Sequence, residues 1–544
     1  MVVRSRPFLF AVSLFVGASR LVAAPPTPTA SPAGVRAAVE VTAMDLDVVA
    51  TKDGRPVNDL AREEFVVRLD GKPVPIDFFA RIEAGAVHGP DLATASPDLV
   101  LDALKADDGE TYVPRQFLVY FDDDRLLPQD RLPVIEGLRD FVTRLSPSDR
   151  ASIVSYTGSA RVLVPFTNSK EELLDGLSRL QKASPAGLAW ETQNRQTIQE
   201  LRTTRSSSMR SSILRSWSDQ AAVREQAALG ELARSVSALA ARSGKRTLLL
   251  VTSGYEWYPG QTLTQAYGPS GLAQFDRNIG EELGKVLARA NSSGITIQVF
   301  DAKGLASDVD ASQSVSPAVS PFYKAQNFRE SMAALAGGTG GSLVENRNLF
   351  QADLDRVYRE ASSYYSVGVT LAGVPGTGPR KVEVRTTRPG VIVRARTGFE
   401  AKTADDAAVD RVEMALQNPG AGGDFAATLR IGELEKKGGI GRRTAPWSVS
   451  VPMSELTFRQ EAGSMKAVVE VTLSAVEDTG ARSSIRPEKS TVSIPLAEWE
   501  KFRGQAYVHS GQLKAGKGNM RFVAAVRDVA SGRMALASTD LRVE

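Results

Sequence analysis

The sequence contains no cysteine, and only two of its 544 residues, His88 and His509, are histidines. Without cysteine the chain can form neither a disulfide framework nor a lipid-modified cysteine, so its fold must rest on apolar cores alone. Two isolated histidines also leave almost no material for a zinc site or for a serine–histidine–aspartate triad. These absences argue against zinc enzymes and triad hydrolases, and no catalytic residue or organic cofactor is indicated.

An excess of charge of one sign is lacking as well. The chain has 66 Lys and Arg residues against 63 Asp and Glu residues, a formal net charge of +3. The first 24 residues carry three arginines and no acidic residue, so their removal would leave a neutral chain. A neutral chain offers no electrostatic basis for binding nucleic acid or an anionic membrane. No later apolar segment is long enough to span a bilayer, so we expect no integral membrane span in the mature chain.

The start of the chain has a pattern typical of a secretory signal peptide. Basic residues precede a short apolar run, residues 7–18, and the small residues Ala23 and Ala24 follow it. We therefore assign residues 1–24 as a signal peptide and expect an exported protein, either periplasmic or extracellular. The alternative is a leader that is retained as an N-terminal anchor.

The periodicity of apolar residues predicts an α/β domain flanked by two β-rich parts. From Gln116 onward, apolar runs typical of buried strands alternate with segments of helical spacing, which predicts a doubly wound, mostly parallel sheet. We assign Tyr364–Thr370 to the last strand of that pattern. Hairpin signals at Asp53-Gly54 and Asp70-Gly71 predict a small antiparallel β unit before this domain. Short alternating segments separated by glycines predict an antiparallel β-sandwich after it.

An insertion interrupts the α/β pattern between residues 184 and 244. Its second half has apolar residues at spacings of three and four and is expected to be helical. Its first half is rich in Ser and Arg and is either a partner-binding arm or a solvated helical extension. The predicted organisation is a signal peptide (1–24), a Pro-rich tether (25–35), an N-terminal β unit (36–85), a linker (86–115), the α/β domain (116–372), a β segment packing on the base (373–400), a helical link (401–420) and the C-terminal sandwich (421–544).

Three consecutive carboxylates, Asp122, Asp123 and Asp124, come directly after the apolar strand that begins at Gln116. Open α/β sheets bind their ligands beyond the carboxyl ends of the strands, so these residues mark the expected functional edge. The structural alternative is that the three charges only cap the N-terminus of the following helix.

Segments spread over residues 36–400 resemble the bacterial von Willebrand factor A-related proteins that are common in Acidobacteria. The segments that carry the resemblance are Asp53-Gly-Arg-Pro-Val-Asn-Asp-Leu60, Phe65-Val-Val-Arg-Leu-Asp-Gly-Lys-Pro73, the strand ending at Asp122, Ser148-Asp-Arg-Ala-Ser-Ile-Val154, Ile295-Thr-Ile-Gln-Val-Phe-Asp301, Leu335-Ala-Gly-Gly-Thr-Gly-Gly341 and Pro389 to Gly398. The C-terminal sandwich lies outside the resemblance.

The resemblance implies a type A domain with a metal-ion-dependent adhesion site at the carboxyl edge of its sheet. In that family the site uses Asp-x-Ser-x-Ser, a Thr from another loop and an Asp after the fourth strand, which suit a hard divalent ion. Here Asp122 matches the leading Asp, Asp124 and Leu126 replace the two serines, and Ser253 stands in place of the later Asp. The candidate ligands for Mg²⁺ or Mn²⁺ are therefore Asp122, Asp124 and Ser253, in a degenerate site.

On these grounds we expect a non-enzymatic module that binds a protein partner by adhesion through the carboxyl edge of the sheet. A metal-independent envelope scaffold that binds through the 184–244 insertion or the C-terminal sandwich is the alternative. A third interpretation is a Mg²⁺-dependent phosphatase-like enzyme, because Asp122-x-Asp124 after an apolar strand has the spacing of a nucleophile and acid pair. The further acids that such chemistry requires are missing from Thr252-Ser-Gly254.

Overall fold

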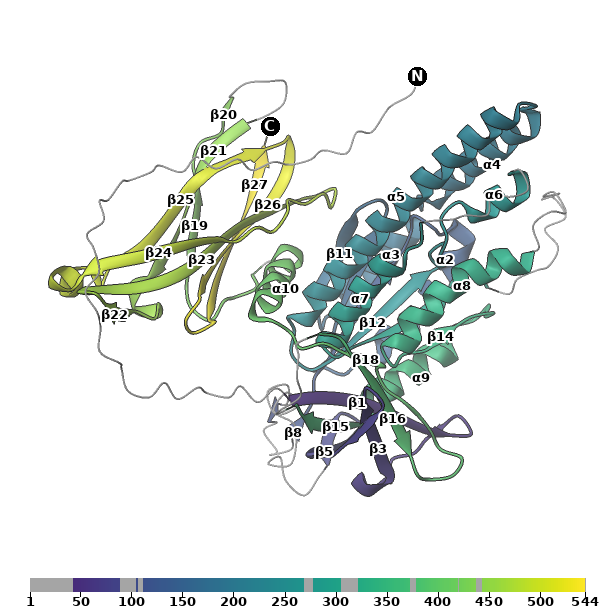
Figure 1. Ribbon diagram of the computed structural model, residues 1–544, viewed down its shortest axis with the longest axis horizontal. Coiled ribbons are helices and arrows are strands. Elements are labelled where there is room, and N and C mark those ends of the chain that lie inside the picture. Colours follow the sequence, from purple (N-terminus) through teal and green to yellow (C-terminus); the bar gives the residue numbers. More distant parts are fainter. Residues whose placement is uncertain are drawn as a thin grey trace. The chain divides into compact units, whose positions relative to one another are not determined.

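The computed structural model describes residues 43–88, 104–105, 111–268, 277–304, 321–371, 378–418, 420–436 and 443–543. The expected signal peptide and tether, and much of the linker at 86–115, lie outside these residues. The described chain divides into a larger compact unit, within residues 43–418, and a smaller one that begins at Gly420 (Figure 1). The short segment Thr479–Ala481 groups with the larger unit.

A six-stranded sheet forms the centre of the larger unit, with the strand order β11-β10-β9-β12-β13-β14. Only the pair β10–β11 is antiparallel. In chain order this is 3-2-1-4-5-6, the order of doubly wound α/β sheets, so the expected mixed α/β architecture is present. The strands are β9 (Arg115–Phe121), β10 (Arg150–Tyr156), β11 (Ala160–Thr167), β12 (Lys245–Thr252), β13 (Ile295–Asp301) and β14 (Leu343–Val344).

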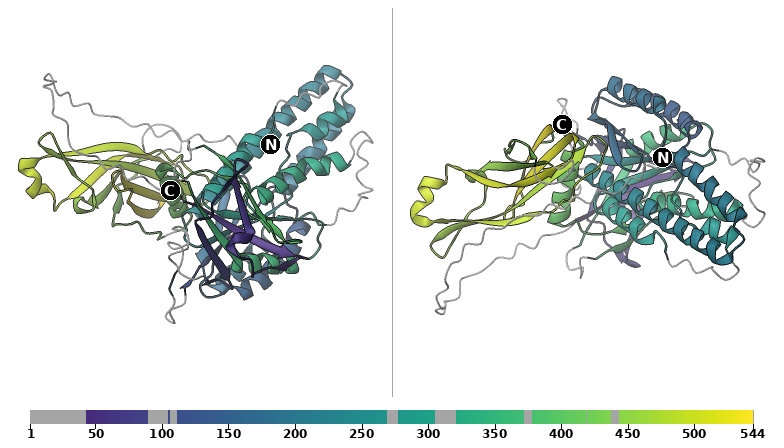
Figure 2. Two further views of the ribbon diagram at one scale, coloured as in Figure 1. Left: turned by 60° about the horizontal axis from the view of Figure 1, so that its bottom comes forward. Right: turned by 90° about the horizontal axis from the view of Figure 1, so that it is seen from above.

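Helices cover both faces of this sheet, which explains why β9, β10, β12 and β13 are almost entirely buried (Figures 1 and 2). Phe117, Val119 and Phe121 of β9 enter one core, and Leu118 and Tyr120 enter the other. The first core is closed by α2 (Pro128–Arg144), α3 (Lys170–Lys182) and α9 (Gln351–Ser362). The second is closed by α5 (Ser207–Ala240), α7 (Gly280–Ser292) and α8 (Pro321–Gly338).

Below the amino-terminal edge of this sheet lies a base built from both ends of the larger unit. Its main sheet has the order β17-β1-β15-β5-β6-β8-β7 with β2 paired to β1, and a smaller sheet has the order β18-β16-β3-β4. The strands are β1 (Ala43–Lys52), β2 (Arg55–Pro56), β3 (Phe65–Leu69), β4 (Lys72–Val74), β5 (Phe78–Glu83), β6 (Ala86–His88), β7 (Leu104–Lys105), β8 (Thr111–Tyr112), β15 (Tyr364–Thr370), β16 (Arg380–Thr386), β17 (Ile392–Arg394) and β18 (Gly398–Phe399).

The strand Tyr364–Thr370 corrects one expectation from the sequence. We expected it to extend the doubly wound sheet, but β15 pairs antiparallel with β1 and β5 of the base. The physical reason is that a short apolar run shows a buried strand and not the sheet to which the strand belongs. Its alternate residues Tyr365, Val367 and Val369 enter the base core. The base therefore joins chain segments that are some 300 residues apart, such as Leu46 and Val367.

The turn and helix-cap residues adopt the conformations that their side chains favour. Asp53-Gly54 and Asp70-Gly71 have positive φ angles at both positions, which is the geometry of a two-residue hairpin turn. These turns join β1 to β2 and β3 to β4. The hydroxyl of Ser169 accepts a hydrogen bond from the amide of Glu172 at 3.2 Å and so caps the N-terminus of α3.

The insertion at 184–244 forms two helices, α4 (Gly187–Thr203) and the whole of the 34-residue α5. The carboxyl-terminal half of α5 packs on the sheet, on α7 and on α10 (Ala404–Gln417). Its amino-terminal half extends beyond the sheet beside α4 and α6 (Gln261–Tyr267), as both further views show (Figure 2). Trp190 and Trp217 stack there at 4.4 Å between ring centroids and join α4 to α5.

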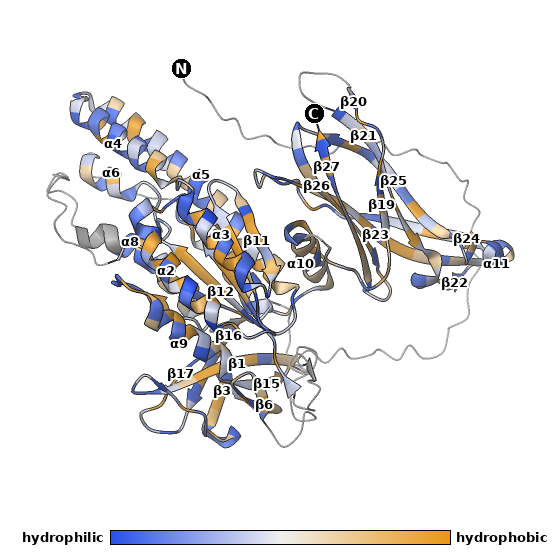
Figure 3. Cartoon of the chain, turned by 180° about the vertical axis from the view of Figure 1, so that it is seen from behind, coloured by the Kyte–Doolittle hydropathy of each residue, from blue (hydrophilic) through white to orange (hydrophobic). Residues whose placement is uncertain are grey.

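The smaller unit consists of two antiparallel sheets around one apolar core, and hydrophobic residues recur along its strands (Figure 3). One sheet has the order β19-β21-β20 with β25 paired to β21, and the other β22-β23-β26-β27 with β24 paired to β23. The strands are β19 (Thr428–Ile431), β20 (Glu435–Lys436), β21 (Arg443–Pro452), β22 (Arg459–Glu461), β23 (Ser464–Glu477), β24 (Glu488–Pro495), β25 (Ala506–Ala515), β26 (Gly518–Asp528) and β27 (Met534–Val543), with a short helix α11 (Trp499–Phe502). Within the residues described in both units, no helix has the length and apolar character needed to cross a membrane.

Candidate functional site

The three carboxylates after β9 lie together at the carboxyl edge of the six-stranded sheet. Main-chain hydrogen bonds fix their positions, because the amide of Asp122 donates to Val251 of β12 and the amide of Asp124 donates to Tyr156 of β10, both at 2.9 Å. Parallel strands end at a common edge, so the side chains of three strands converge at this point. The three carboxylates thus lie at the sheet edge, and their role as a binding site stays a prediction.

Each carboxylate makes an ion pair with a different arginine. Asp122 pairs with Arg125 at 2.9 Å, and Asp123 pairs with Arg131 at 3.2 Å. Asp124 pairs with Arg224 at 2.6 Å, although Arg224 lies 100 residues further along the chain. The site is therefore an interleaved set of acids and arginines and not a concentration of negative charge.

Arg125 lies at the centre of this set, and its side chain is only 2% exposed. On the side away from Asp122, its guanidinium pairs with Glu225 of α5 at 2.8 Å, and it lies 4.7 Å from the ring centroid of Tyr255. Burial alone would lower the pKa of Arg125, but the carboxylates of Glu225 and Asp122 outweigh burial and raise it. A permanent positive charge is thus held between two buried carboxylates.

Asp122 is fully buried. Burial raises the pKa of Asp122 to about 6, and the positive charge of Arg125 opposes that rise. The hydroxyl of Thr252 donates a hydrogen bond to Asp122 Oδ2 at 2.9 Å. Asp122 Oδ1 accepts no hydrogen bond from the described residues, so it is the one open oxygen of this carboxylate.

The hydroxyl of Ser253, the third candidate ligand, binds the main chain. It is 5% exposed, and its hydroxyl donates to the main-chain oxygen of Arg125 at 3.2 Å. The structure thus brings Asp122, Asp124 and Ser253 to one edge, but each is engaged by the chain itself. Leu126, at the position of the second family serine, is buried in the core.

The donor set does not fit a divalent ion. The guanidinium of Arg125 lies 2.9 Å from Asp122 Oδ2. A metal ion at the open Oδ1 would share the same carboxylate with this guanidinium. The two positive charges would repel each other strongly, because the site is buried. Among the described residues, no group of three or more His, Cys, Asp or Glu side chains is arranged to hold a metal. Arg125 lies between Asp122 and Glu225 and pairs with both carboxylates.

The residues that sequence reasoning missed are Arg125, Arg224, Glu225 and Thr252. Arg125 directly follows the acidic run, so its charge was visible in the sequence, although not its inward direction. Arg224 and Glu225 gave no signal, because contacts across 100 residues of intervening chain are not encoded in local spacing.

The helical insertion covers the edge above these ion pairs. The amide of Gly187, at the start of α4, donates to the main-chain oxygen of Asp123 at 3.1 Å. A Cβ at Gly187 would stand 2.4 Å from the main-chain oxygen of Leu126, so only glycine allows this approach. Arg224 binds the main-chain oxygen of Asp124 at 2.6 Å and lies 4.4 Å from the ring centroid of Trp190.

Beyond the edge, the end of the insertion carries a strong positive charge. Residues 201–218, which we call the arginine tip, contain four arginines and no acidic residue. Arg205 and Arg215 are exposed on it. Three large apolar side chains of the insertion are also exposed, Leu188 (46%), Met209 (58%) and Val223 (65%). Exposed Glu200 and Asp219 flank this stretch, so the accessible surface is basic within residues 201–218 and mixed in charge on either side.

Comparison with known proteins gives little beyond this geometry. No protein-family model matches the chain, and no curated protein matches it. Among solved structures, the conserved hypothetical protein BatB from Bacteroides thetaiotaomicron is similar at 14% identity and a TM-score of 0.24, over 46% of this chain and 98% of that one. A von Willebrand factor type A protein from Catenulispora acidiphila is similar at 11% identity and a TM-score of 0.23, over 93% and 74%. A mutant of the PilB minor pilin from Streptococcus sanguinis gives 11% and 0.25, over 60% and 80%. At scores this low the likenesses carry no argument, and the fold rests on its own strand order and register.

Proposed function

We propose that this chain is an exported, non-enzymatic protein-binding module of von Willebrand factor A type that works without a metal ion. The family assignment is supported by the resembling segments at residues 36–400 and by the 3-2-1-4-5-6 strand order. One observation carries the proposal. The guanidinium of Arg125 fills the cation position between Asp122 and Glu225, 2.9 and 2.8 Å from their carboxylate oxygens.

Burial argues against adhesion or catalysis by the carboxylates themselves. Asp122 is fully buried, and the side chain of Asp124 is 19% exposed and paired with Arg224. A partner's carboxylate, or a phosphate ester awaiting attack, could not reach Asp122 unless the residues that bury it moved, and at Asp124 it would meet a carboxylate already paired with Arg224. The structure thus favours the metal-independent alternative over metal-dependent adhesion and over a phosphatase-like activity.

The partner would then bind the part of the insertion that extends over the edge. The arginine tip combines four cations with the exposed side chain of Met209, and arginine is a residue type enriched at protein interfaces. Charge complementarity selects a protein with an exposed acidic surface, and such pairing mainly accelerates association and fixes orientation.

Capture of envelope and culture-supernatant proteins by the full chain tests the proposal. We expect the same captured proteins with and without EDTA, and their loss from an Arg205→Glu/Arg215→Glu double variant. A matched control, Arg430→Glu/Arg542→Glu, changes the charge equally at exposed positions of the smaller unit and should capture normally. The proposal is contradicted if EDTA abolishes capture, or if the Arg205→Glu/Arg215→Glu variant still captures the same proteins.

Direct titration separates the metal question from the partner. Calorimetry of the full chain with Mg²⁺ and Mn²⁺ should give no saturable heat, because Arg125 already supplies the positive charge. Saturable binding that is lost in Asp122→Ala would instead restore the metal-dependent interpretation, with Asp122, Asp124 and Ser253 as its ligands.

A further inference from the structure

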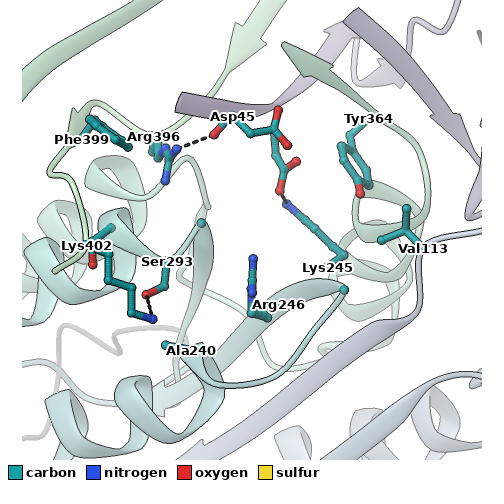
Figure 4. Close-up of a pocket in the computed structure, with 14 residues that line it drawn as sticks. Asp45, Val113, Ala240, Lys245, Arg246, Ser293, Tyr364, Arg396, Phe399 and Lys402 are labelled. Atoms are coloured by element: carbon teal, nitrogen blue, oxygen red, sulfur yellow. Dashed lines mark hydrogen bonds and ion pairs between the residues drawn. The ribbon is translucent and has the colours of Figure 1, made fainter. Parts of the chain in front are cut away.

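A second candidate site lies at the opposite, amino-terminal edge of the six-stranded sheet, and it is independent of the proposed function. There the starts of β12 and β13 face β1 and β15 of the base, and a cavity of about 270 Å³ opens between them (Figure 4). Pockets for small molecules begin at roughly 300 Å³, so this one suits a small ligand. All of its lining residues belong to the larger unit.

The wall of this cavity is rich in charge and predominantly positive. Four cationic side chains and two carboxylates line it, a formal excess of two positive charges. Figure 4 shows the cations arranged around one opening. The charged lining residues are Lys245, Arg246, Arg396 and Lys402 with Asp45 and Asp47.

The two lysines are held in place by neighbouring groups. Lys245 pairs with Asp47, and its Nζ lies 4.8 Å from the ring centroid of Tyr364. Lys402 pairs with Asp410 of α10 and donates to the hydroxyl of Ser293 at 3.3 Å. Both ammonium groups are therefore positioned before any ligand arrives, which lowers the cost of ordering them on binding.

The two guanidinium groups converge on Gly294, the residue before β13. A Cβ on Gly294 would lie 3.8 Å from Arg246 Nη2 and 3.9 Å from Arg396 Nη1. Both groups are held in place around this space, because Arg396 donates to the main-chain oxygens of Asn291 and Asp45, and Arg246 donates to that of Arg242 at 2.8 Å. The absence of a side chain at Gly294 leaves the space between them open, and guanidinium groups match the geometry of carboxylate and phosphate oxygens.

We propose that this cavity binds a small dianion, either a phosphate monoester or a short dicarboxylate. Arg246 and Arg396 would bind one oxyanion beside Gly294, and Lys402 with Ser293 would donate to the other end of the ligand. A cation is disfavoured by the positive excess, and an apolar ligand is disfavoured because it would strip water from charged walls. Phosphate and carboxylate share the chemistry that the walls select, so titration must separate them.

Calorimetric titration of the full chain with inorganic phosphate and with succinate tests the proposal. A salt concentration of about 0.15 M shortens the Debye length to about 8 Å and suppresses loose surface association. We expect one saturable site for at least one of the two probes. Arg246→Gln should weaken that binding at least tenfold, and Ser293→Asp should abolish it by adding a negative charge to the wall.

Arg68→Gln is the matched control, because it removes one arginine from an exposed position of β3 outside the cavity lining. It should bind the probe as the wild type does. Circular dichroism shows whether each variant is folded, and Lys402→Gln replaces Arg246→Gln should the latter fail to fold. Absence of saturable binding for both probes overturns the proposal. Equal binding by wild type, Arg246→Gln (or Lys402→Gln) and Ser293→Asp also overturns it.

Discussion

At the scale of single residues, the environment of Arg125 explains how two buried carboxylates are balanced within the chain. Asp122 and Glu225 are both buried, and neither could remain charged in the interior without a compensating cation. Arg125 supplies that cation with two ion pairs and a contact to the Tyr255 ring. The same arrangement makes the site sensitive, because removal of one partner leaves buried charge unpaired.

Substitution of Arg125 by Met should therefore destabilise the larger unit by about 3–5 kcal/mol, the usual cost of breaking a buried pair. Arg277→Met is the control, since Arg277 pairs with Asp219 where both side chains are more than 60% exposed. That change should cost less than about 1 kcal/mol. Urea unfolding followed by tryptophan fluorescence measures both. Equal effects of the two substitutions would show that the buried network is not a stabilising element.

A second residue-scale prediction concerns Glu256, which is 8% exposed and accepts a hydrogen bond from the amide of Gly260 at 3.0 Å. Burial raises the pKa of Glu256 from 4.5 to about 7. Between these pH values the folded state keeps a proton that the unfolded state has lost, so stability falls as pH rises through this window and is level above it. The contribution is roughly 3 kcal/mol.

Glu256→Gln should remove that part of the pH dependence, because a neutral amide does not titrate. Thermal unfolding at pH 5 and pH 8 measures this pH dependence. From pH 5 to pH 8 the wild type should lose more stability than Glu256→Gln does. Glu281→Gln, at an exposed position of α7, should keep the slope of the wild type. A wild-type slope that persists unchanged in Glu256→Gln would mean that other groups cause it.

The residue scale also shows what the sequence could and could not predict about the site. The strand-end position of Asp122 followed from the apolar run before it, and the hairpin glycines followed from their turn chemistry. The ion partners did not, because Arg224 and Glu225 reach Asp124 and Arg125 only through the path of a helix 100 residues away. Whether a carboxylate binds a metal or a guanidinium is decided by such distant contacts.

At the scale of elements, α5 combines two roles along one helix. Its carboxyl-terminal half is part of the core, where Leu229, Leu232 and Val236 are fully buried. Its amino-terminal half extends past the sheet and presents polar and basic residues.

Strand prediction from the sequence has a limit at this scale. Tyr364–Thr370 is a strand as expected, but it belongs to another sheet. Local pattern determines the element type, whereas packing partners determine its place.

This division within α5 predicts unequal effects of two similar truncations. Leu232→Ala should cost about 2–5 kcal/mol, because it leaves a cavity in a closely packed core. Met209→Ala, at a 58% exposed position of the same helix, should change stability by less than about 0.5 kcal/mol. Urea unfolding of both variants provides the measurement. A large cost for Met209→Ala would show that the end of α5 is buried in solution, contrary to the proposed binding surface.

At the scale of the whole molecule, the division into two compact units predicts two separate unfolding transitions. Each unit has its own apolar core, with no residue shared between the base and sheet cores and the core that begins at Phe425. Cores of this kind unfold as separate cooperative units. A chain ending at residue 419 should therefore keep the transition of the larger unit within about 2 °C, which for a unit of this size corresponds to roughly 1–2 kcal/mol. Tryptophan fluorescence reports on that unit through Trp190, Trp217 and Trp257. A single transition in the full chain, or a larger shift on truncation, would show that the two units stabilise each other and that the smaller one acts as more than an appended domain.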